Sequence, residues 1–236
     1  MRTYSLFALT MLMLSIHAGA EDKPHAGKTI WMVKAEQLEW RDLDEDDGAS
    51  WDITSWVGND LNKLSLASEG ERDDDGTESA ETRLAWQRAV APYWDLQLGW
   101  RRDWQPDDPN RHWAMAAMTG TAPYFIETSV QLFFGGDTRT QLRMEFEKEL
   151  LLTQRLELVP SIELTAFGQA DAAQQVDHGL AKVEAGLRLH YSLVRQVAPY
   201  IGVHHERLTG GTADIAEADG HKTTETVLVA GLRLWY

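Results

Sequence analysis

Long runs in which apolar and polar residues alternate constrain this chain more than any other feature. Residues 141–150 (QLRMEFEKEL), 155–167 (RLELVPSIELTAF) and 182–191 (KVEAGLRLHY) place an apolar side chain at nearly every second position. Successive side chains of a β-strand point to opposite faces, so a period of two gives a strand one apolar and one polar face. An amphipathic helix would need a period near 3.6 residues. The pattern predicts an all-β fold.

About ten strands are predicted when the alternating runs are counted along the chain. Long polar loops follow most odd-numbered strands, for example QPDDPNR (105–111) and GQADAAQQVDHG (168–179), and short turns follow the even-numbered ones. The exception is the brief GGDT link at 135–138. The predicted spans are 56–68, 80–90, 93–104, 111–120, 124–134, 140–151, 155–167, 180–192, 199–208 and 223–236.

These strands are predicted to close into a transmembrane antiparallel up-and-down β-barrel. Long loops at one end, short turns at the other and strands of about ten residues are typical of outer-membrane barrels. Closure is required because an open strand edge cannot form its hydrogen bonds in lipid. A soluble β-sandwich also alternates, but its interior would have to hold the carboxylates and arginines of the polar faces, and unpaired buried charge is costly. The polar faces instead suit a polar lumen.

The first 20 residues have the pattern of a cleaved secretory signal. Arg2 precedes an apolar stretch from Leu6 to Ile16, and Ala18-Gly19-Ala20 follows, so cleavage is expected after Ala20. A short membrane anchor is the alternative, but the apolar stretch is shorter than the roughly 20 residues that a spanning helix needs. The predicted organisation is a signal peptide over 1–20, a flexible acidic periplasmic segment over 21–50 and the barrel over 51–236.

The composition narrows the partners and the chemistry. The chain has 22 Lys and Arg against 37 Asp and Glu, a net charge of −15, so nucleic acid is not an expected partner. Cysteine is absent, which excludes disulfides and thiolate metal ligands. The sequence also lacks Gly-x-Ser-x-Gly, HExxH, Walker and Gly-rich nucleotide motifs, so we do not expect an enzyme.

The C-terminus independently favours the outer membrane of a Gram-negative bacterium. In LVAGLRLWY (228–236) the alternation ends on the aromatic Tyr236. An alternating last strand with an aromatic end resembles the signal by which the barrel assembly machinery recognises its substrates. The expected partners are therefore this machinery and the lipid and lipopolysaccharide of the outer membrane.

Several segments also carry a family resemblance. WDITSWVGNDLNKLSLASEGE (51–71), RAVAPYWDLQLGWRRD (88–103) and ELLLTQRLEL (149–158), with further matches at 121–164, 179–207 and 229–236, resemble the copper resistance protein B family (CopB/PcoB). The resemblance covers nearly all of the chain from Trp51 onward. It implies an outer-membrane barrel that binds copper ions or assists their export from the periplasm, and it suggests a periplasmic copper protein as a further partner.

One departure from the family pattern directs the search for copper ligands. Members often carry a long extension rich in Met and His before the barrel, whereas residues 21–50 of this chain contain only His25 and Met32 of these types. Any metal chemistry is therefore expected inside the barrel.

Imidazole and carboxylate groups on the polar faces are the first ligand candidates. Cu(II) accepts both groups, while Cu(I) favours thioether and imidazole. By parity His190 and His204 face inward on neighbouring strands, and Glu184 and Glu206 share that face. His205 should point outward, so the adjacent pair is not expected to chelate a metal. The alternative is that each histidine is a hydrogen-bonded residue of the lumen.

Met115 is a thioether candidate for the same site. Met115 and Met118 have opposite parity in their strand, so only one of them can face the lumen. Methionine also fills gaps in packed interiors, which is the alternative interpretation.

The inward positions also carry many charges. Glu145, Glu147 and Glu149 form a ladder on one face. The basic residues expected to face inward are Arg83, Arg101, Arg143, Lys182, Arg188 and Arg233. These charges either hold a narrow lumen together as ion pairs or line a cation pathway. The predicted function is an outer-membrane copper resistance protein that binds copper or assists its export; the alternative is a small cation channel or structural barrel without a copper role.

The tripeptide Ala-Pro-Tyr occurs three times, at 91–93, 122–124 and 198–200. Each copy falls where an even-numbered predicted strand leads into the next, so all three should lie at the periplasmic rim, where Pro suits a turn. Tyr93, Tyr124 and Tyr200 are then expected at membrane-interface depth as girdle residues.

Overall fold

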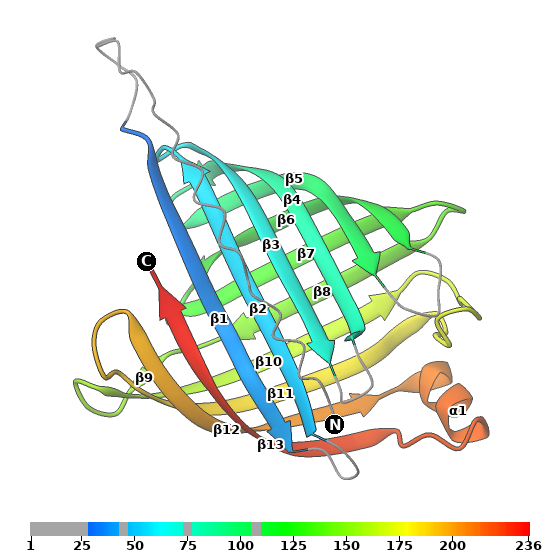
Figure 1. Cartoon of the computed structure of the whole chain (residues 1–236). Helices are drawn as coiled ribbons and strands as arrows, with labels where there is room; N and C mark the ends of the chain where they lie inside the picture. The colour runs from blue at the N-terminus through cyan, green and yellow to red at the C-terminus, as the bar shows by residue number, and fades with distance from the viewer. Residues whose placement is uncertain (1–27, 43–46, 73–76, 105–109) are drawn as a thin grey trace, which may run out of the picture.

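The chain folds into a closed antiparallel β-barrel, seen from the side in Figure 1. The computed structural model describes residues 28–42, 47–72, 77–104 and 110–236. Within these residues twelve strands pair around the barrel, and the pairing of β10 with β11 and of β1 with β13 closes it. The two-residue strand β9 pairs only with β10. The elements are β1 (Ile30–Asp42), β2 (Asp47–Gly58), β3 (Asn62–Arg72), β4 (Thr77–Ala91), β5 (Trp94–Trp104), β6 (Arg111–Ala122), β7 (Ile126–Gly135), β8 (Thr140–Glu147), β9 (Leu150–Leu151), β10 (Leu156–Phe167), β11 (Gly179–Tyr191), β12 (Val197–Leu208), α1 (Gly210–Ala218) and β13 (Thr224–Trp235).

Side chains are distributed in the opposite way to those of a water-soluble protein. On the outer wall Leu84 lies opposite Trp100, and Trp86 lies opposite Leu98; all four are exposed. The buried positions of the inner wall instead hold many polar and charged side chains, Arg101 among them. An apolar outer belt around a polar interior is the pattern of a barrel that crosses a bilayer, so the predicted fold class is confirmed.

The barrel has twelve strands where about ten were predicted, and the difference lies at its N-terminal side. The predicted strand over 56–68 is wrong, because it spans the turn between β2 and β3. Residues 30–42 and 47–50 were expected in a flexible segment but lie in β1 and β2, so the barrel begins at Ile30 and not at residue 51. The expected signal peptide, residues 1–20, lies outside the described residues.

A β-bulge explains why β1 escaped detection. The pairing of β1 with β2 shifts register between Ala35 and Gln37. The order in which side chains point inward and outward is therefore reversed after the bulge. A bulge inserts one extra residue into a strand and interrupts the period of two. The sequence WMVKAEQLEWRD therefore does not alternate, although all of it is strand.

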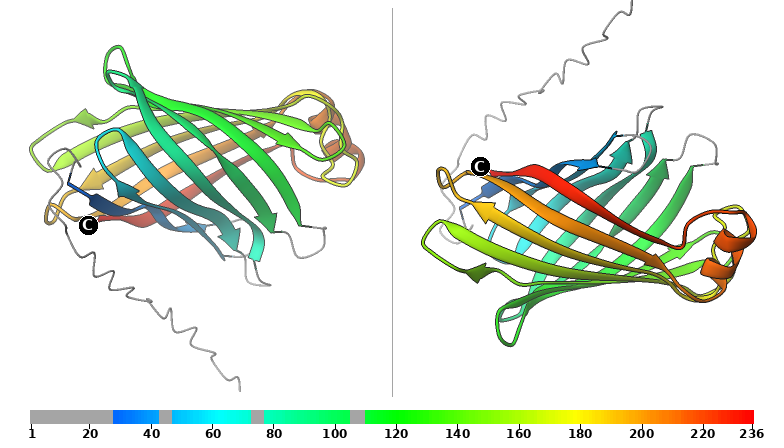
Figure 2. Two further views of the ribbon diagram at one scale, coloured as in Figure 1. Left: turned by 90° about the horizontal axis from the view of Figure 1, so that it is seen from above. Right: turned by 90° about the horizontal axis from the view of Figure 1, so that it is seen from below.

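The connections give the barrel two different ends. Short turns at 59–61, 92–93 and 123–125 and the C-terminus lie at one end, named here the turn end. The links at 168–178 and 209–223, the latter containing α1, lie at the opposite end, named the loop end, as the views in Figure 2 show. In outer-membrane barrels the short turns face the periplasm and the long loops face outward. No helix in the described part of the chain has the length and apolar character needed to cross a membrane.

The three Ala-Pro-Tyr copies do not share one role. Tyr93 and Tyr124 lie in turns with positive φ angles of 67° and 68° and are 81% and 80% exposed, as expected of girdle residues. The prediction for Tyr200 is wrong. It lies within β12, is only 4% exposed and faces the lumen, because the β11–β12 turn precedes Val197 and leaves Pro199 paired with Leu232 in the sheet.

Candidate functional site

Charged side chains from several strands meet inside the loop-end half of the barrel. Glu81 on β4 receives two hydrogen bonds from Arg143 on β8, both 3.1 Å long. Its carboxylate also lies 3.0 Å from Arg101 Nε and 3.2 Å from Arg83 Nε. Because three strands separate β4 from β8 in the sheet, the Arg143–Glu81 pair reaches across the lumen and narrows it.

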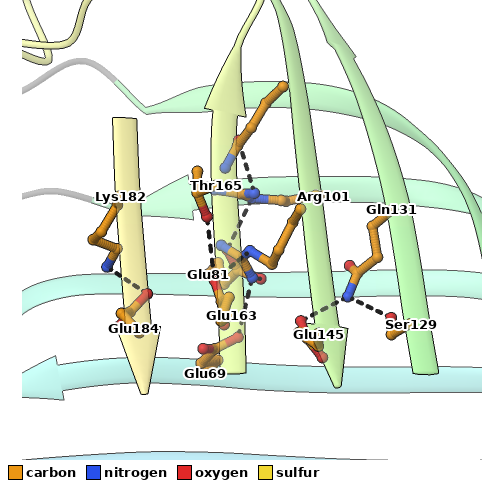
Figure 3. Close-up of polar contacts among 12 residues, drawn as sticks. Glu69, Glu81, Arg101, Ser129, Gln131, Glu145, Glu163, Thr165, Lys182 and Glu184 are labelled. Carbon is orange, nitrogen blue, oxygen red and sulfur yellow. Dashed lines mark hydrogen bonds and ion pairs between the residues drawn. The ribbon is translucent and has the colours of Figure 1, made fainter. Parts of the chain in front are cut away.

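Further carboxylates lie around the same arginines. Glu69 lies 3.2 Å from Arg83 and 3.4 Å from Arg143, and Glu163 lies 3.2 Å from Arg143. Figure 3 shows Glu69, Glu81 and Glu163 gathered between the strands, with the Lys182–Glu184 pair beside them. The ion pairs expected from the charged inward faces are therefore present.

A second charged cluster surrounds Glu39 of β1, whose side chain is fully buried. Its carboxylate accepts hydrogen bonds from Arg188 Nε at 2.9 Å, Arg41 Nε at 3.0 Å and the Tyr200 hydroxyl at 3.1 Å. Arg41 also donates to Glu71 at 2.5 Å. This cluster joins β1 to β11 and β12, so it ties the N-terminal side of the barrel to its C-terminal side.

A cavity in the lumen reaches the turn end. Its volume is about 580 Å³, and its lining extends to Thr121 and Glu127, next to the β6–β7 turn. Nine carboxylate side chains line it against three arginines and one histidine: Glu36, Asp52, Glu69, Glu71, Glu127, Glu145, Glu147, Glu163 and Glu184 against Arg41, Arg83, Arg188 and His204. A cavity with this balance attracts cations.

A smaller cavity of about 190 Å³ lies toward the loop end. It shares Arg41, Glu69, Glu71, Glu163 and Glu184 with the larger cavity, so the two meet at a level lined chiefly by carboxylates. A cation that enters from the turn end therefore encounters more carboxylates than arginines before it reaches the Arg143–Glu81 pair.

Three predicted site residues come together at this junction. Glu184 pairs with Glu206 across β11 and β12, and His204 is two residues before Glu206 on the same face. One ligand atom from each of the three lies within 4.8 Å of the others. Among the described residues His204 Nε2 has no hydrogen-bond partner, although it is buried; it lies 3.6 Å from Glu184. We name Glu184, His204 and Glu206 the Glu-His-Glu cluster.

The donor set of the Glu-His-Glu cluster fits a divalent copper ion better than a monovalent one. One imidazole nitrogen and two carboxylates are ligands that Cu(II) accepts, whereas Cu(I) prefers sulfur and imidazole. The cluster supplies no sulfur. Its members come from two hydrogen-bonded strands, which holds their backbone positions fixed.

His190 and Met115 are not part of the cluster. His190 is paired with Tyr200, four residues along β12 from His204, which corresponds to about 13 Å along the strand. Its ring stacks on Tyr200 with centroids 4.6 Å apart. Met115 faces the lumen, as the parity argument allowed, and Met118 faces outward, but Met115 packs in an apolar group with Trp113 and Phe133. Met115 also lines the larger cavity, so its role as a copper ligand stays a prediction.

Sequence reasoning did not place Lys182 beside the Glu-His-Glu cluster. Lys182 lies 3.0 Å from Glu184 and 3.4 Å from Glu206. It was predicted to face inward, and its position two residues before Glu184 was the available signal. Glu39 was missed because its strand was not predicted.

The 168–178 loop is held over the loop end by ion pairs. Asp171 contacts Arg111 at the start of β6 and lies 3.1 Å from Arg139 Nε in the β7–β8 turn. Gln174 of the same loop lines the smaller cavity. Burial alone would raise the pKa of the Asp171 carboxyl, but its hydrogen bond to Arg111 and the charge of Arg111 outweigh burial and lower that pKa below its ordinary value.

A closed barrel with an apolar outer belt, an acidic lumen and long loops at one end is an integral outer-membrane protein. The NanC porin, a solved structure, matches with a TM-score of 0.54 over 87% of this chain and 99% of the porin chain. The two sequences are 10% identical, so this likeness concerns the fold alone.

The sequence comparisons identify the family. Residues 29–236 match the family described as "Copper resistance protein B precursor (CopB)". The chain is 40% identical over 212 residues to copper resistance protein B of Escherichia coli, covering 90% of this chain and 71% of that protein. It is 39% identical over 202 residues to a copper resistance protein B homolog of Pseudomonas syringae pv. tomato (strain ATCC BAA-871 / DC3000), covering 86% and 68%. The chain belongs to the copper resistance protein B family.

Proposed function

We propose that this barrel contributes to copper resistance by binding copper ions in its lumen and assisting their export from the periplasm. Family membership supports the role in copper resistance. The observation that carries the binding proposal is the Glu-His-Glu cluster, whose ligand atoms lie within 4.8 Å of one another beside an acidic cavity. In this proposal the cavity collects copper at the periplasmic end and the cluster is its binding site.

The chemistry of the lumen supports divalent copper as the ion. Nine carboxylates line the cavity, and carboxylates attract dications more strongly than monovalent ions because the attraction scales with charge. The imidazole of His204 then adds selectivity for a transition metal over Mg²⁺ and Ca²⁺, which prefer oxygen ligands alone. A periplasmic copper protein that delivers the ion at the turn end is the partner that this direction of transport requires.

Copper titration of the refolded barrel tests the proposal. We expect His204→Ala to weaken Cu(II) binding by about tenfold or more, because it removes the single nitrogen ligand of the cluster. His205→Ala is the matched control, since His205 is the next residue on β12, faces away from the lumen and hydrogen-bonds Thr226 at 2.7 Å. Heat-modifiable migration on an unboiled gel establishes that each variant is folded.

Two results would contradict the proposal. If His204→Ala and His205→Ala bind Cu(II) equally well, the cluster is not the ligand site. If a strain lacking the protein tolerates copper as well as the parent strain, the role in copper resistance fails.

A small cation channel without a copper role is the alternative function, and the acidic cavity favours it. Such a channel would conduct K⁺ in planar bilayers at a rate that neither Cu(II) nor His204→Ala changes. The copper-binding function instead predicts that micromolar Cu(II) reduces any K⁺ conductance of the wild type and leaves that of His204→Ala unaffected.

A further inference from the structure

The Glu-His-Glu cluster already holds a positive charge, the ammonium group of Lys182. Lys182 Nζ lies 3.0 Å from Glu184 Oε2 and 3.4 Å from Glu206 Oε2. An ammonium group donates three hydrogen bonds and accepts none, so it occupies carboxylate lone pairs that a metal ion would use. His204 Nε2, in contrast, has no hydrogen-bond partner in the part of the chain that the structure describes. The ammonium group therefore occupies one oxygen of each carboxylate, while the imidazole nitrogen lies 3.6 Å from the other oxygen of Glu184.

Glu184 lies between the two lumen cavities, and His204 and Lys182 face different ones. His204 lines the larger cavity that reaches the turn end, and Lys182 lines the smaller cavity toward the loop end. Glu184 lines both. A cation arriving from the periplasm thus meets His204 and Glu184 first, with the ammonium group on the far side.

We propose that Lys182 is an internal competitor for the copper ligands and that copper binds by displacing it. This inference rests on the proposed function and concerns the regulation of the same site. The lysine stem is long and flexible, and the smaller cavity contains other carboxylates, Glu71 and Glu163 among them, to which the displaced ammonium group can turn.

This arrangement makes binding reversible. When copper leaves, Lys182 can return to Glu184 and Glu206, so these half-buried carboxylates are not left facing each other without a cation. The competitor weakens binding without removing a ligand. A site of this kind suits transfer of copper through the lumen and is unsuited to permanent storage.

Removal of the ammonium group tests the inference. Lys182→Met keeps the length of the side chain and removes its charge, and we expect it to bind Cu(II) about tenfold or more tightly than the wild type. Because the thioether that it introduces can itself bind copper, Lys182→Gln must show the same gain. Lys63→Met is the matched control, because Lys63 lies 3.6 Å from Asp95 and is not among the residues lining either cavity. It should leave the affinity unchanged. The gain should disappear in the double variant Lys182→Met, His204→Ala.

The outcomes separate this inference from the proposed function. If His204→Ala weakens copper binding but Lys182→Met leaves it equal or weaker, the competitor role is wrong and the binding site stands. If His204→Ala has no effect in the wild type, the binding site itself is wrong. Lys182→Arg retains the charge and should bind no more tightly than the wild type. If Lys182→Met does not migrate as a folded barrel, Lys182→Gln, which keeps hydrogen-bond donors for the carboxylates, should show the same gain.

Discussion

The buried carboxylate of Glu39 offers the sharpest test of the structure, because a strand that the sequence did not predict carries it. Its side chain is fully buried, and it accepts hydrogen bonds from Arg188, Arg41 and Tyr200. In Glu39→Gln an amide NH2 group replaces one acceptor oxygen. A hydrogen-bond donor then faces the N–H donors of a guanidinium group.

The expected cost follows from the partners that remain. Arg188 is 7% exposed in its side chain, and removing one partner of a buried ion pair costs about 3–5 kcal/mol. The loss of interaction energy is smaller for Arg41, because it keeps its 2.5 Å contact with Glu71. We therefore expect Glu39→Gln to lower the free energy of unfolding by about 3–5 kcal/mol. Tyr200→Phe, which removes one hydrogen bond to the Glu39 carboxylate, should cost about 1.5–3 kcal/mol.

Reversible urea unfolding in lipid vesicles, followed by tryptophan fluorescence and gel mobility, measures these values. Glu71→Gln is the control, since its side chain is 45% exposed and a pair this exposed contributes about 1 kcal/mol or less. Replacing both Glu39 and Arg188 with Met should restore most of the loss, because neither charge is then left unpaired. A Glu39→Gln barrel within 1 kcal/mol of the wild type would refute the placement of β1 beside β13.

Two further predictions concern the loop end. The lowered pKa of Asp171 means that its ion pair with Arg111 stabilises the 168–178 loop fully above the ordinary pKa of about 3.9 and is lost as the pH falls through the lower folded value. Hydrogen exchange corrected for intrinsic rates should show that the amide protection of this loop decreases when the pH is lowered below about 4. Asp171→Asn should remove both the protection and its pH dependence. Protection that persists in the variant would contradict the ion-pair explanation. Arg143→Ser removes the guanidinium that crosses the lumen to Glu81 and should raise cation conductance in planar bilayers. Arg155→Ser, at an exposed position between β9 and β10, should leave the conductance unchanged. Equal conductance of both variants would show that Arg143 does not narrow the path.

Much of the barrel could be predicted from the chain alone. Nine of the predicted spans, from 80–90 onward, fall on strands of the barrel. The inward positions of Glu184, His204 and Glu206 also followed from counting residues along two neighbouring strands, because each strand alternates and a short turn joins them.

The errors arose where a local pattern was interrupted or repeated in a different setting. The bulge after Ala35 concealed β1, and with it Glu39. Tyr200 has the same two preceding residues as Tyr93, yet one lies in a strand facing the lumen and the other in an exposed turn. A tripeptide does not specify where the chain reverses; the pairing of the whole strand does.

The sequence by itself determined the class of fold, the two faces of most strands and the family, because alternation and motif similarity are local properties of the chain. Only the tertiary structure decided which charges meet. Arg143 and Glu81 are 62 residues apart, and Arg188 and Glu39 are 149 apart. The distance between the two charged groups of each pair depends on the number and tilt of the strands around the closed barrel. For the same reason the position of Lys182 against both carboxylates, on which the proposed control of copper binding rests, became visible only once β11 and β12 were in register.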